Sequence, residues 1–307
     1  MSVIGFDTSN YTTSIAFFDG NHAENISQLL PVKAGELGLR QSDAVFHHTK
    51  SLPELSSRLF CNVNPDQISA VGVSTRPRNV DGSYMPCFMV GYSHAKMLSE
   101  ALHVPLYEFS HQEGHIAAAA WSAGRMDLLD MPHLAWHLSG GTTELLYVEP
   151  KSGSVTCSKI GGTSDISAGQ LIDRTGQLLD LPFPSGKYLD ELSENCLTSD
   201  FFQVKCTDMT FSFSGVQNKV QEYYKKCQDS TEVAGYALRS ICNTILRATQ
   251  NAINIHPGVP VVFSGGVSSN RMLRRIMSAV EPIFAEPRYS TDNALGTAVL
   301  TYRMQED

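Results

Sequence analysis

No apolar run in the 307-residue sequence approaches the roughly 20 residues that a membrane-spanning helix needs. The first residues also lack the basic region and the apolar core of a signal peptide, and they enter a strand pattern at once. A membrane protein and a secreted protein are therefore not expected, and we predict a cytoplasmic protein.

Cysteine motifs and an excess of basic residues are missing as well. Seven cysteines are scattered without any C-x-x-C spacing, which argues against a zinc ribbon and a disulfide framework. The formal net charge is −8, whereas proteins that bind nucleic acid on their own are usually basic. Any nucleic-acid role would therefore need a local patch or a partner. Hydrophobic residues make up 42%, which predicts a globular chain, and its length suggests two lobes.

Two histidines, His111 and His115, stand four residues apart at the start of a predicted helix. Four alanines at positions 117–120 favour that helix. Residues i and i+4 lie on one helix face, so the two imidazoles could bind one metal ion. The alternative is a partly solvated helix start with two unrelated histidines. Gln112 replaces the glutamate of the zinc-protease H-E-x-x-H motif, so proteolysis is not expected.

A strand–turn–strand pattern occurs twice, over residues 3–18 and 134–148, which indicates a duplicated lobe. Three predicted strands end in turns of small polar residues that let backbone N–H groups approach an anion: Asp7-Thr8-Ser9, Ser139-Gly140-Gly141-Thr142 and Ser264-Gly265-Gly266-Val267. We predict an α/β fold of the actin-like ATPase type. Its two lobes, residues 1–118 plus 293–307 and residues 119–292, would share a nucleotide-binding cleft.

Hydrophobic periodicity places the other elements. Helices are predicted over residues 52–60, 86–102, 168–179, 214–224, 233–252 and 293–304. Buried strands are predicted over residues 68–73 and 259–263, a short strand over residues 104–107 and a further strand over residues 24–30.

Three further side chains are candidates for these sites. Asp292 could cap the final helix or supply a carboxylate to the histidine pair. His137, at the end of a predicted buried strand, is either a core histidine or a third imidazole ligand. Asp173 either binds ribose hydroxyls or is an ordinary exposed carboxylate.

The sequence resembles the tRNA threonylcarbamoyladenosine transferase family, once called O-sialoglycoprotein endopeptidases, along almost its whole length. Eight motifs occur in the family's order: Gly5-Phe6-Asp7-Thr8-Ser9, His111-x-x-x-His115, Ser139-Gly140-Gly141, Ala168-Gly169-x-x-x-Asp173, Pro184-Ser185-Gly186 with Asp190, Phe211-Ser212-Phe213-Ser214-Gly215, Gly265-Gly266-Val267-x-x-Asn270 and Thr291-Asp292-Asn293.

The resemblance implies an actin-like, duplicated ribonuclease-H-like fold and one divalent metal ion, iron or zinc, held by His111, His115 and Asp292. In the archaeal and eukaryotic branch a tyrosine two residues before the Ser-Gly-Gly turn is also a ligand, and His137 occupies that position here. The resemblance further implies an adenylate site, which could also take ATP or AMP, formed by Ser139, Gly140, Gly141, Asp173, Gly186, Asp190 and Asn270.

The implied enzyme is an acyltransferase rather than a protease. It would move a threonylcarbamoyl group from its adenylate to N6 of the adenosine beside the tRNA anticodon, with the metal as Lewis acid. Partner proteins would help to bind the tRNA, and a separate enzyme would supply the adenylate. The motifs assign no catalytic side chain and leave the oligomeric state open, with a homodimer and a heterodimer both possible.

The acceptor side departs from the family pattern. Asn10-Tyr11-Thr12 stands where the family usually has Cys-Asp-Glu. Arg76 and Arg78 flank Pro77 where a glycine-rich turn is expected, and they are either solvated or clamp a phosphate or carboxylate. Two alternatives follow: transfer of a carbamoyl-type group to a non-tRNA acceptor, or a non-catalytic nucleotide-binding regulator.

Overall fold

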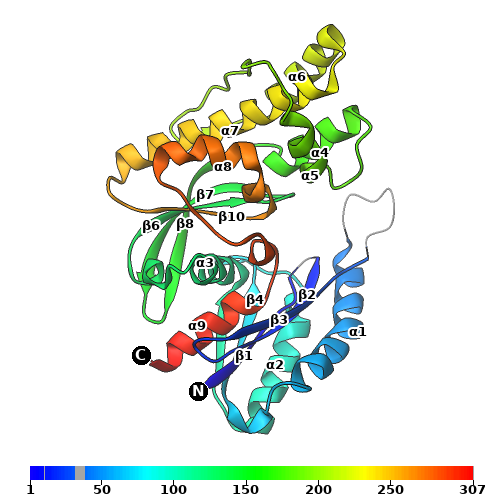
Figure 1. Cartoon of the computed structure of the whole chain (residues 1–307). Coiled ribbons are helices and arrows are strands. Elements are labelled where there is room, and N and C mark those ends of the chain that lie inside the picture. Colours follow the sequence, from blue (N-terminus) through cyan, green and yellow to red (C-terminus); the bar gives the residue numbers. More distant parts are fainter. Residues whose placement is uncertain (10, 32–38, 307) are drawn as a thin grey trace. The chain divides into compact units, whose positions relative to one another are not determined.

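The computed structural model describes residues 1–9, 11–31 and 39–306 and divides into two α/β units (Figure 1). The first unit comprises Met1–Met131, Glu149–Cys157 and Arg288–Asp307, and the second comprises Pro132–Val148 and Ser158–Pro287. The lobe limits expected from the sequence remain a prediction. None of the described helices combines the length and the apolar character that crossing a membrane requires.

The first unit is built on a five-stranded sheet in the order β3-β2-β1-β4-β5. Strand β2 is antiparallel to β1 and β3, β4 is parallel to β1, and β5 is parallel to β4. Helices α1 and α2 pack on one face and α3 and α9 on the other (Figure 1). The bounds are β1 Ser2–Asp7, β2 Thr12–Phe18, β3 Ala23–Leu29, α1 Gln41–Phe60, β4 Ile68–Arg76, α2 Phe88–Leu102, β5 Leu106–Ser110, α3 His111–Ser122 and α9 Leu295–Glu306.

The alternation of side chains along β1 explains why helices can pack on both faces of this sheet, since successive side chains point to opposite faces. Ile4 and Phe6 are buried in the cluster that α1 and α2 complete. Gly5 faces the opposite way, where a Cβ atom would lie 2.7 Å from the backbone nitrogen of Ala298 on α9. The glycine thus allows α9 to lie directly on the sheet.

The second unit carries a six-stranded sheet in the order β11-β10-β6-β7-β8-β9. Without β9 this order repeats that of the first sheet, with β6, β7, β8, β10 and β11 in the places of β1 to β5. The predicted duplication is therefore confirmed. The bounds are β6 His133–Leu138, β7 Thr143–Lys151, β8 Ser154–Thr163, α4 Ala168–Leu178, α5 Gly186–Ser193, β9 Thr210–Phe211, α6 Ser214–Cys227, α7 Ser230–Ile255, β10 Val261–Ser264, α8 Arg271–Met277 and β11 Ile283–Phe284.

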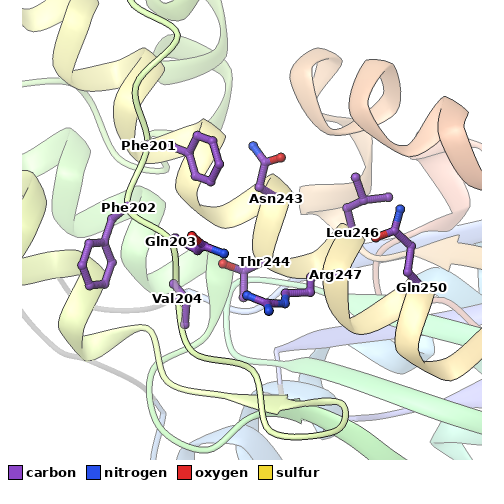
Figure 2. Close-up of a pocket in the computed structure, with 9 residues that line it drawn as sticks. All are labelled: Phe201, Phe202, Gln203, Val204, Asn243, Thr244, Leu246, Arg247 and Gln250. Carbon is purple, nitrogen blue, oxygen red and sulfur yellow. The ribbon is translucent and has the colours of Figure 1, made fainter.

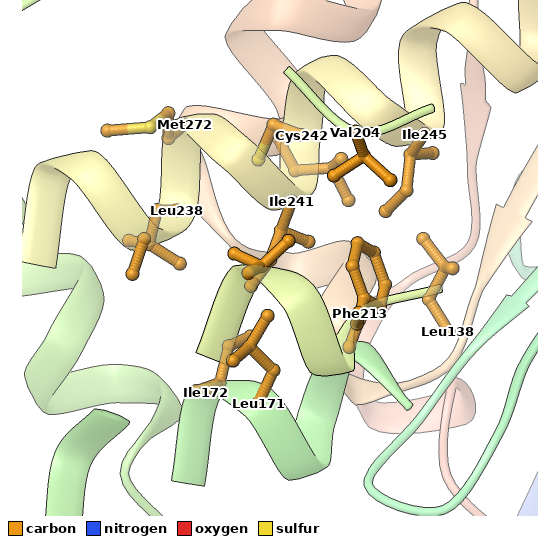
Figure 3. Close-up of a cluster of buried hydrophobic side chains, with 14 of the residues drawn as sticks. Leu138, Leu171, Ile172, Val204, Phe213, Leu238, Ile241, Cys242, Ile245 and Met272 are labelled. Carbon is orange, nitrogen blue, oxygen red and sulfur yellow. The ribbon is translucent and has the colours of Figure 1, made fainter. Parts of the chain in front are cut away.

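Helix α7 organises the core of the second unit (Figure 3). Its buried Ile241 and Ile245 belong to one cluster with Leu171 of α4 and Leu138 of β6. Full burial of such side chains stabilises a fold by about 1.5–3 kcal/mol each. The indole N–H of Trp136 also donates to Oγ1 of Thr249, 2.9 Å away, which fixes α7 on β6.

Most predicted helices and strands form, with their ends shifted by a few residues. The largest correction concerns α1, which begins at Gln41 instead of residue 52. Residues 41–51 are mostly polar, but Ala44, His48 and Ser51 are buried on one face of the helix. Packing against the sheet therefore extends the helix beyond what its hydrophobic pattern indicates.

Candidate functional site

Two histidines and an aspartate meet in the first unit. The ligand-capable atoms of His111, His115 and Asp292 all lie within 4.8 Å of one another. The two Nε2 atoms are 2.9 Å apart, and each lies 3.4 Å from Oδ1 of Asp292. The structure thus brings together residues 111 and 292, which are far apart in the sequence.

A capping box fixes the histidine pair at the start of α3. Oγ of Ser110 accepts the backbone N–H of Glu113 at 3.2 Å, and the Glu113 carboxylate accepts the N–H of Ser110 at 2.7 Å. This reciprocal arrangement satisfies two backbone donors and defines where the helix begins. His111 is therefore the first helical residue, and His115 follows one turn later on the same face.

The second oxygen of Glu113 holds another part of the first unit. Ser154, in the β7–β8 hairpin, donates its hydroxyl to Oε1 of Glu113 at 3.0 Å. Glu113 is only 4% exposed, so both carboxylate oxygens are satisfied inside the protein. The Ser-x-x-Glu spacing signals the cap in the sequence, but no sequence signal identifies Ser154.

Helix α9 brings Asp292 to the histidines because it crosses α3 at two glycines. A Cβ atom on Gly296 would lie 1.7 Å from the carbonyl oxygen of Gly114, so no larger residue fits there without movement. Asn293, rather than Asp292, bonds to the start of α9, since its Oδ1 accepts the N–H of Leu295 at 3.1 Å. The Asp292 carboxylate lies instead against the two imidazoles.

Asp7 fixes the orientation of His111 through Nδ1, the ring nitrogen that does not face His115 and Asp292. Its Oδ2 lies 2.7 Å from Nδ1 of His111, and its Oδ1 accepts the N–H of Ser9 at 2.9 Å. Histidines that bind metals usually donate their second ring N–H to such a carboxylate. Asp7 belongs to the polar turn that the sequence pointed to, but its bond to His111 was not predicted.

The charges of this group favour a cation. Burial lowers the pKa of His111, but the carboxylates of Asp7 and Asp292 outweigh burial and raise it to about 10. Burial, together with the neighbouring cationic His111, lowers the pKa of His115. The pKa of Asp292 lies well below its usual range because hydrogen bonds to the histidines outweigh burial, and that of Asp7 is lowered by His111 in the same way. Two carboxylates thus face one imidazolium and one neutral imidazole.

In the second unit, α4 packs directly on the Ser139-Gly140-Gly141 turn. The turn is closed by the N–H of Ser139, which donates to the carbonyl of Thr142 at 2.8 Å. Ser167, the N-cap of α4, donates its hydroxyl to the carbonyl of Gly140 at 2.6 Å. A Cβ atom on Gly169 would lie 2.5 Å from Cα of Gly140, which explains the glycine after Ala168.

The remaining predicted nucleotide-binding residues form two pairs in the same unit. Oδ1 of Asp173 accepts the N–H of Ser185 at 2.8 Å, which positions Gly186 at the start of α5. Burial raises the pKa of Asp173, and the Ser185 bond opposes this. The Asp190 carboxylate accepts hydrogen bonds from Nδ2 of Asn270 at 2.7 Å and from Nε of Arg271 at 3.1 Å. The bond between Arg271 and Asp190 was not predicted from the sequence.

Both glycine turns of this unit face open space. Cβ atoms built on Gly140, Gly141 and Gly266 have no described atom within 4 Å. Gly265 has a positive φ of 87°, and a Cβ there would lie 2.2 Å from the carbonyl oxygen of Leu138. The turns after β6 and β10 therefore lie close together, with backbone groups accessible to an anion.

Other predicted residues lie outside the histidine–aspartate group. His137 is on β6 in the second unit, so its role as a metal ligand remains a prediction. Arg76 donates to Oγ1 of Thr75 and to Oδ1 of Asn79, at 3.2 and 3.0 Å. Its loop lies on the first turn of α3, because the carbonyl of Pro77 accepts the N–H of residue 112. Asn10 lies outside the described residues.

Comparison with known sequences gives one consistent family. A family model described as tRNA N6-adenosine threonylcarbamoyltransferase (TsaD) matches residues 32–299. Curated relatives of that name from Lactococcus lactis subsp. cremoris (strain SK11) and Thermosipho africanus (strain TCF52B) are 29% and 27% identical. The alignments cover 98% and 99% of this chain and 91% and 94% of the relatives.

Comparison with solved structures identifies the fold. Full-length HypF in its phosphate- and nucleotide-bound form matches with a TM-score of 0.65 at 15% identity, over 100% of this chain and 47% of HypF. Component A of the Acidaminococcus fermentans (R)-2-hydroxyglutaryl-CoA dehydratase matches over 100% of both chains, with a TM-score of 0.56 at 13% identity. A ROK family glucokinase from Streptomyces griseus matches over 99% of this chain and 100% of its own, with a TM-score of 0.54 at 13% identity. The predicted actin-like ATPase fold is thereby confirmed.

Proposed function

The chain belongs to the tRNA N6-adenosine threonylcarbamoyltransferase family, a family of transferases, and we propose that it moves a threonylcarbamoyl group from threonylcarbamoyl-adenylate to N6 of the adenosine beside the tRNA anticodon. The observation that carries this proposal is the meeting of His111, His115 and Asp292 in a negatively biased group. We place the activity in the cytoplasm, with partner proteins that help to bind the tRNA and an enzyme that supplies the adenylate.

The donor set fits a divalent iron or zinc ion. Two imidazole nitrogens and one carboxylate oxygen are ligands that both metals accept. The bond from Asp7 to Nδ1 of His111 leaves Nε2 directed at the site, as expected of a metal-binding histidine. A bound ion would supply Lewis acidity toward the carbamoyl and phosphate oxygens of the substrate.

The chain's own groups would hold and orient the adenylate. Backbone N–H groups of the turns at Gly140-Gly141 and Gly266 would bind the phosphate. Asp173 uses Oδ1 for the Ser185 N–H, and its Oδ2 would accept a hydrogen bond from a ribose hydroxyl. Asp190 would act indirectly, since its oxygens fix Asn270 and Arg271 beside the second glycine turn.

The test is a transfer assay. The metal-loaded chain, the partner proteins, threonylcarbamoyl-adenylate and unmodified tRNA are incubated together, and the modified nucleoside is measured by mass spectrometry. We expect product with the unaltered chain, and loss of both product and bound metal with His111→Ala and Asp292→Asn. His22→Ala, at an exposed histidine outside the group, is the matched control. Absence of product from the unaltered chain would contradict the proposal.

Transfer to a non-tRNA acceptor is the second candidate. Tyr11 stands where the family usually has an acidic residue, and Arg76 has no carboxylate partner among the described residues, so this side of the site differs in charge from the family pattern. Background-level tRNA affinity, together with consumption of the adenylate by a small-molecule amine, would favour this candidate. A chain that holds neither iron nor zinc and is unchanged by His111→Ala would instead indicate a non-catalytic nucleotide-binding regulator.

A further inference from the structure

A hollow of about 250 Å³ lies in the second unit, between residues 201–204 and one side of α7 (Figure 2). Asn243, Arg247 and Gln250 line it from successive turns of α7, and Phe201 lines it from the other segment. None of these residues was identified from the sequence, and none belongs to the glycine turns or to the histidine–aspartate group.

The walls of the hollow are fixed before any ligand binds. The N–H of Phe202 donates to Oγ of Ser240 at 2.8 Å, and Oγ1 of Thr244 donates to the carbonyl of Ser240 at 2.6 Å. Val204 is 6% exposed and belongs to the hydrophobic core. Glu232 also holds the preceding segment, because it accepts the N–H of Leu197 at 2.8 Å. A ligand would therefore bind with little ordering of the backbone.

The lining combines two phenylalanines, three carboxamides and one cation with Val204, Thr244 and Leu246. Phe201 is 42% exposed, so part of an apolar ring faces water. Gln203, Asn243 and Gln250 each offer both a donor and an acceptor. Arg247 forms no hydrogen bond or ion pair with any described residue, and none of the nine lining residues carries a carboxylate. This chemistry suits a flat ring with polar edges that is attached to an anionic group.

We propose that the hollow binds one unpaired nucleotide of the tRNA substrate. The base would stack on Phe201, the carboxamides would bond to its edge, and Arg247 would bind the adjoining phosphate. Proteins commonly recognise single-stranded RNA by stacking splayed bases on aromatic side chains in this way. With a net charge of −8 the surface as a whole does not attract RNA, so a local site of this kind would add to what partner proteins contribute to tRNA binding. The proposal takes from the proposed function only that the substrate is tRNA.

The experiment measures the affinity of fluorescently labelled, unmodified tRNA for the full chain without adenylate, over a series of salt concentrations. We expect Phe201→Leu to weaken binding about tenfold and Phe201→Tyr, which keeps a ring, to leave it nearly unchanged. Arg247→Gln should weaken binding and lower the slope of log Kd against log salt by about one. Leu197→Ala, at a 93% exposed apolar residue outside the hollow, and Lys225→Gln on α6 are the controls.

Unchanged tRNA affinity in Phe201→Leu and Arg247→Gln, with both variants melting at the temperature of the unaltered chain, would overturn the proposal. Equal losses in Phe201→Leu and Phe201→Tyr would also overturn it, because stacking would then not be the cause. Failure of the proposed function has a different signature: both variants would weaken tRNA binding as expected, while no modified nucleoside forms with any of the proteins. If transfer does occur, KM for tRNA should rise in the variants and kcat should stay unchanged.

Discussion

His111 uses its two ring nitrogens for different partners. Nδ1 is 2.7 Å from the carboxylate of Asp7, and Nε2 faces His115 and Asp292. Because the two carboxylates raise the pKa of His111 to about 10, the imidazole is cationic at neutral pH when no metal is bound. A metal ion must therefore displace a proton from Nε2.

This proton predicts the pH dependence of metal binding. Metal binding requires the loss of the His111 proton. The affinity for the metal therefore rises with pH as long as the pH is below the pKa of His111, about 10. The lowered pKa of His115 means that this residue adds no second proton at neutral pH. We expect zinc affinity to rise about tenfold per pH unit between roughly pH 7 and pH 9, with one proton released per ion.

Isothermal titration calorimetry in buffers of different ionisation enthalpy measures the proton count. In Asp7→Asn the pKa of His111 should fall, so the release should drop below one proton at pH 8. Release of two protons from the unaltered chain, or of none, would show that the charge distribution described above is wrong.

At the scale of elements, the crossing of α3 and α9 decides whether the site exists. The helices touch at Gly114 and Gly296, where an added Cβ would lie 1.7 Å from a carbonyl oxygen. Asp292 lies three residues before the first residue of α9, and both histidines are on α3, so the separation of the two helices influences the distance between the carboxylate and the imidazoles.

Gly296→Ala should therefore damage stability and metal binding together. The methyl group must push the helices apart, and overpacking of this kind costs about 1–3 kcal/mol. Urea unfolding of the metal-free protein measures the free energy, and equilibrium dialysis with zinc measures the affinity. Gly215→Ala on α6 is the matched control, because its Cβ would meet only a ring atom of Phe202 at 3.9 Å. Equal zinc affinity in both variants would contradict this role of the crossing.

The contact between the β7–β8 hairpin and α3 gives a second prediction at this scale. Ser154→Ala removes the donor to Oε1 of Glu113 while the capping box stays in place. A buried carboxylate oxygen left without its partner costs about 1–3 kcal/mol. Hydrogen exchange should accelerate in Glu149–Cys157 and in the first turn of α3. Ser152→Ala, at an exposed serine of the same hairpin, should change neither; if it has the same effect, the Glu113 bond is not the cause.

At the scale of the whole molecule, the two duplicated units carry different candidate sites. His111, His115 and Asp292 are all in the first unit, whereas the seven predicted adenylate-binding residues are all in the second. The two copies of the strand order thus carry different groups, a charged group in the first unit and open glycine turns in the second.

Because the two candidate sites are in different units, we expect zinc to stabilise the first unit and AMP to stabilise the second. Zinc should slow hydrogen exchange in α3 and in the segment before α9, and AMP should slow it around Ser139-Gly140-Gly141 and Gly265-Gly266, since a ligand stabilises the structure that binds it. Mass spectrometry of the exchanged peptides measures both effects. Protection of β6 by zinc alone would instead indicate that His137 takes part in metal binding.

The sequence by itself determined much of this protein. Period-two and helical patterns located most strands and helices, and the repeated strand–turn–strand indicated the duplication that both sheet orders show. The spacing of His111 and His115 on a capped helix and the small residues of the glycine turns were also readable. These features depend on residues within a few positions of one another, where local geometry alone decides the outcome.

Only the tertiary structure decided how these local features combine. Asp7 meets His111 across 104 residues, and Ser154 meets Glu113 across 41. Helix α1 extends eleven residues further than its pattern indicates because the sheet buries one of its faces. The hollow at Phe201 arises where an irregular segment lies along α7. Such contacts depend on how sheets and helices pack, and packing is a property of distant surfaces that no short stretch of sequence contains.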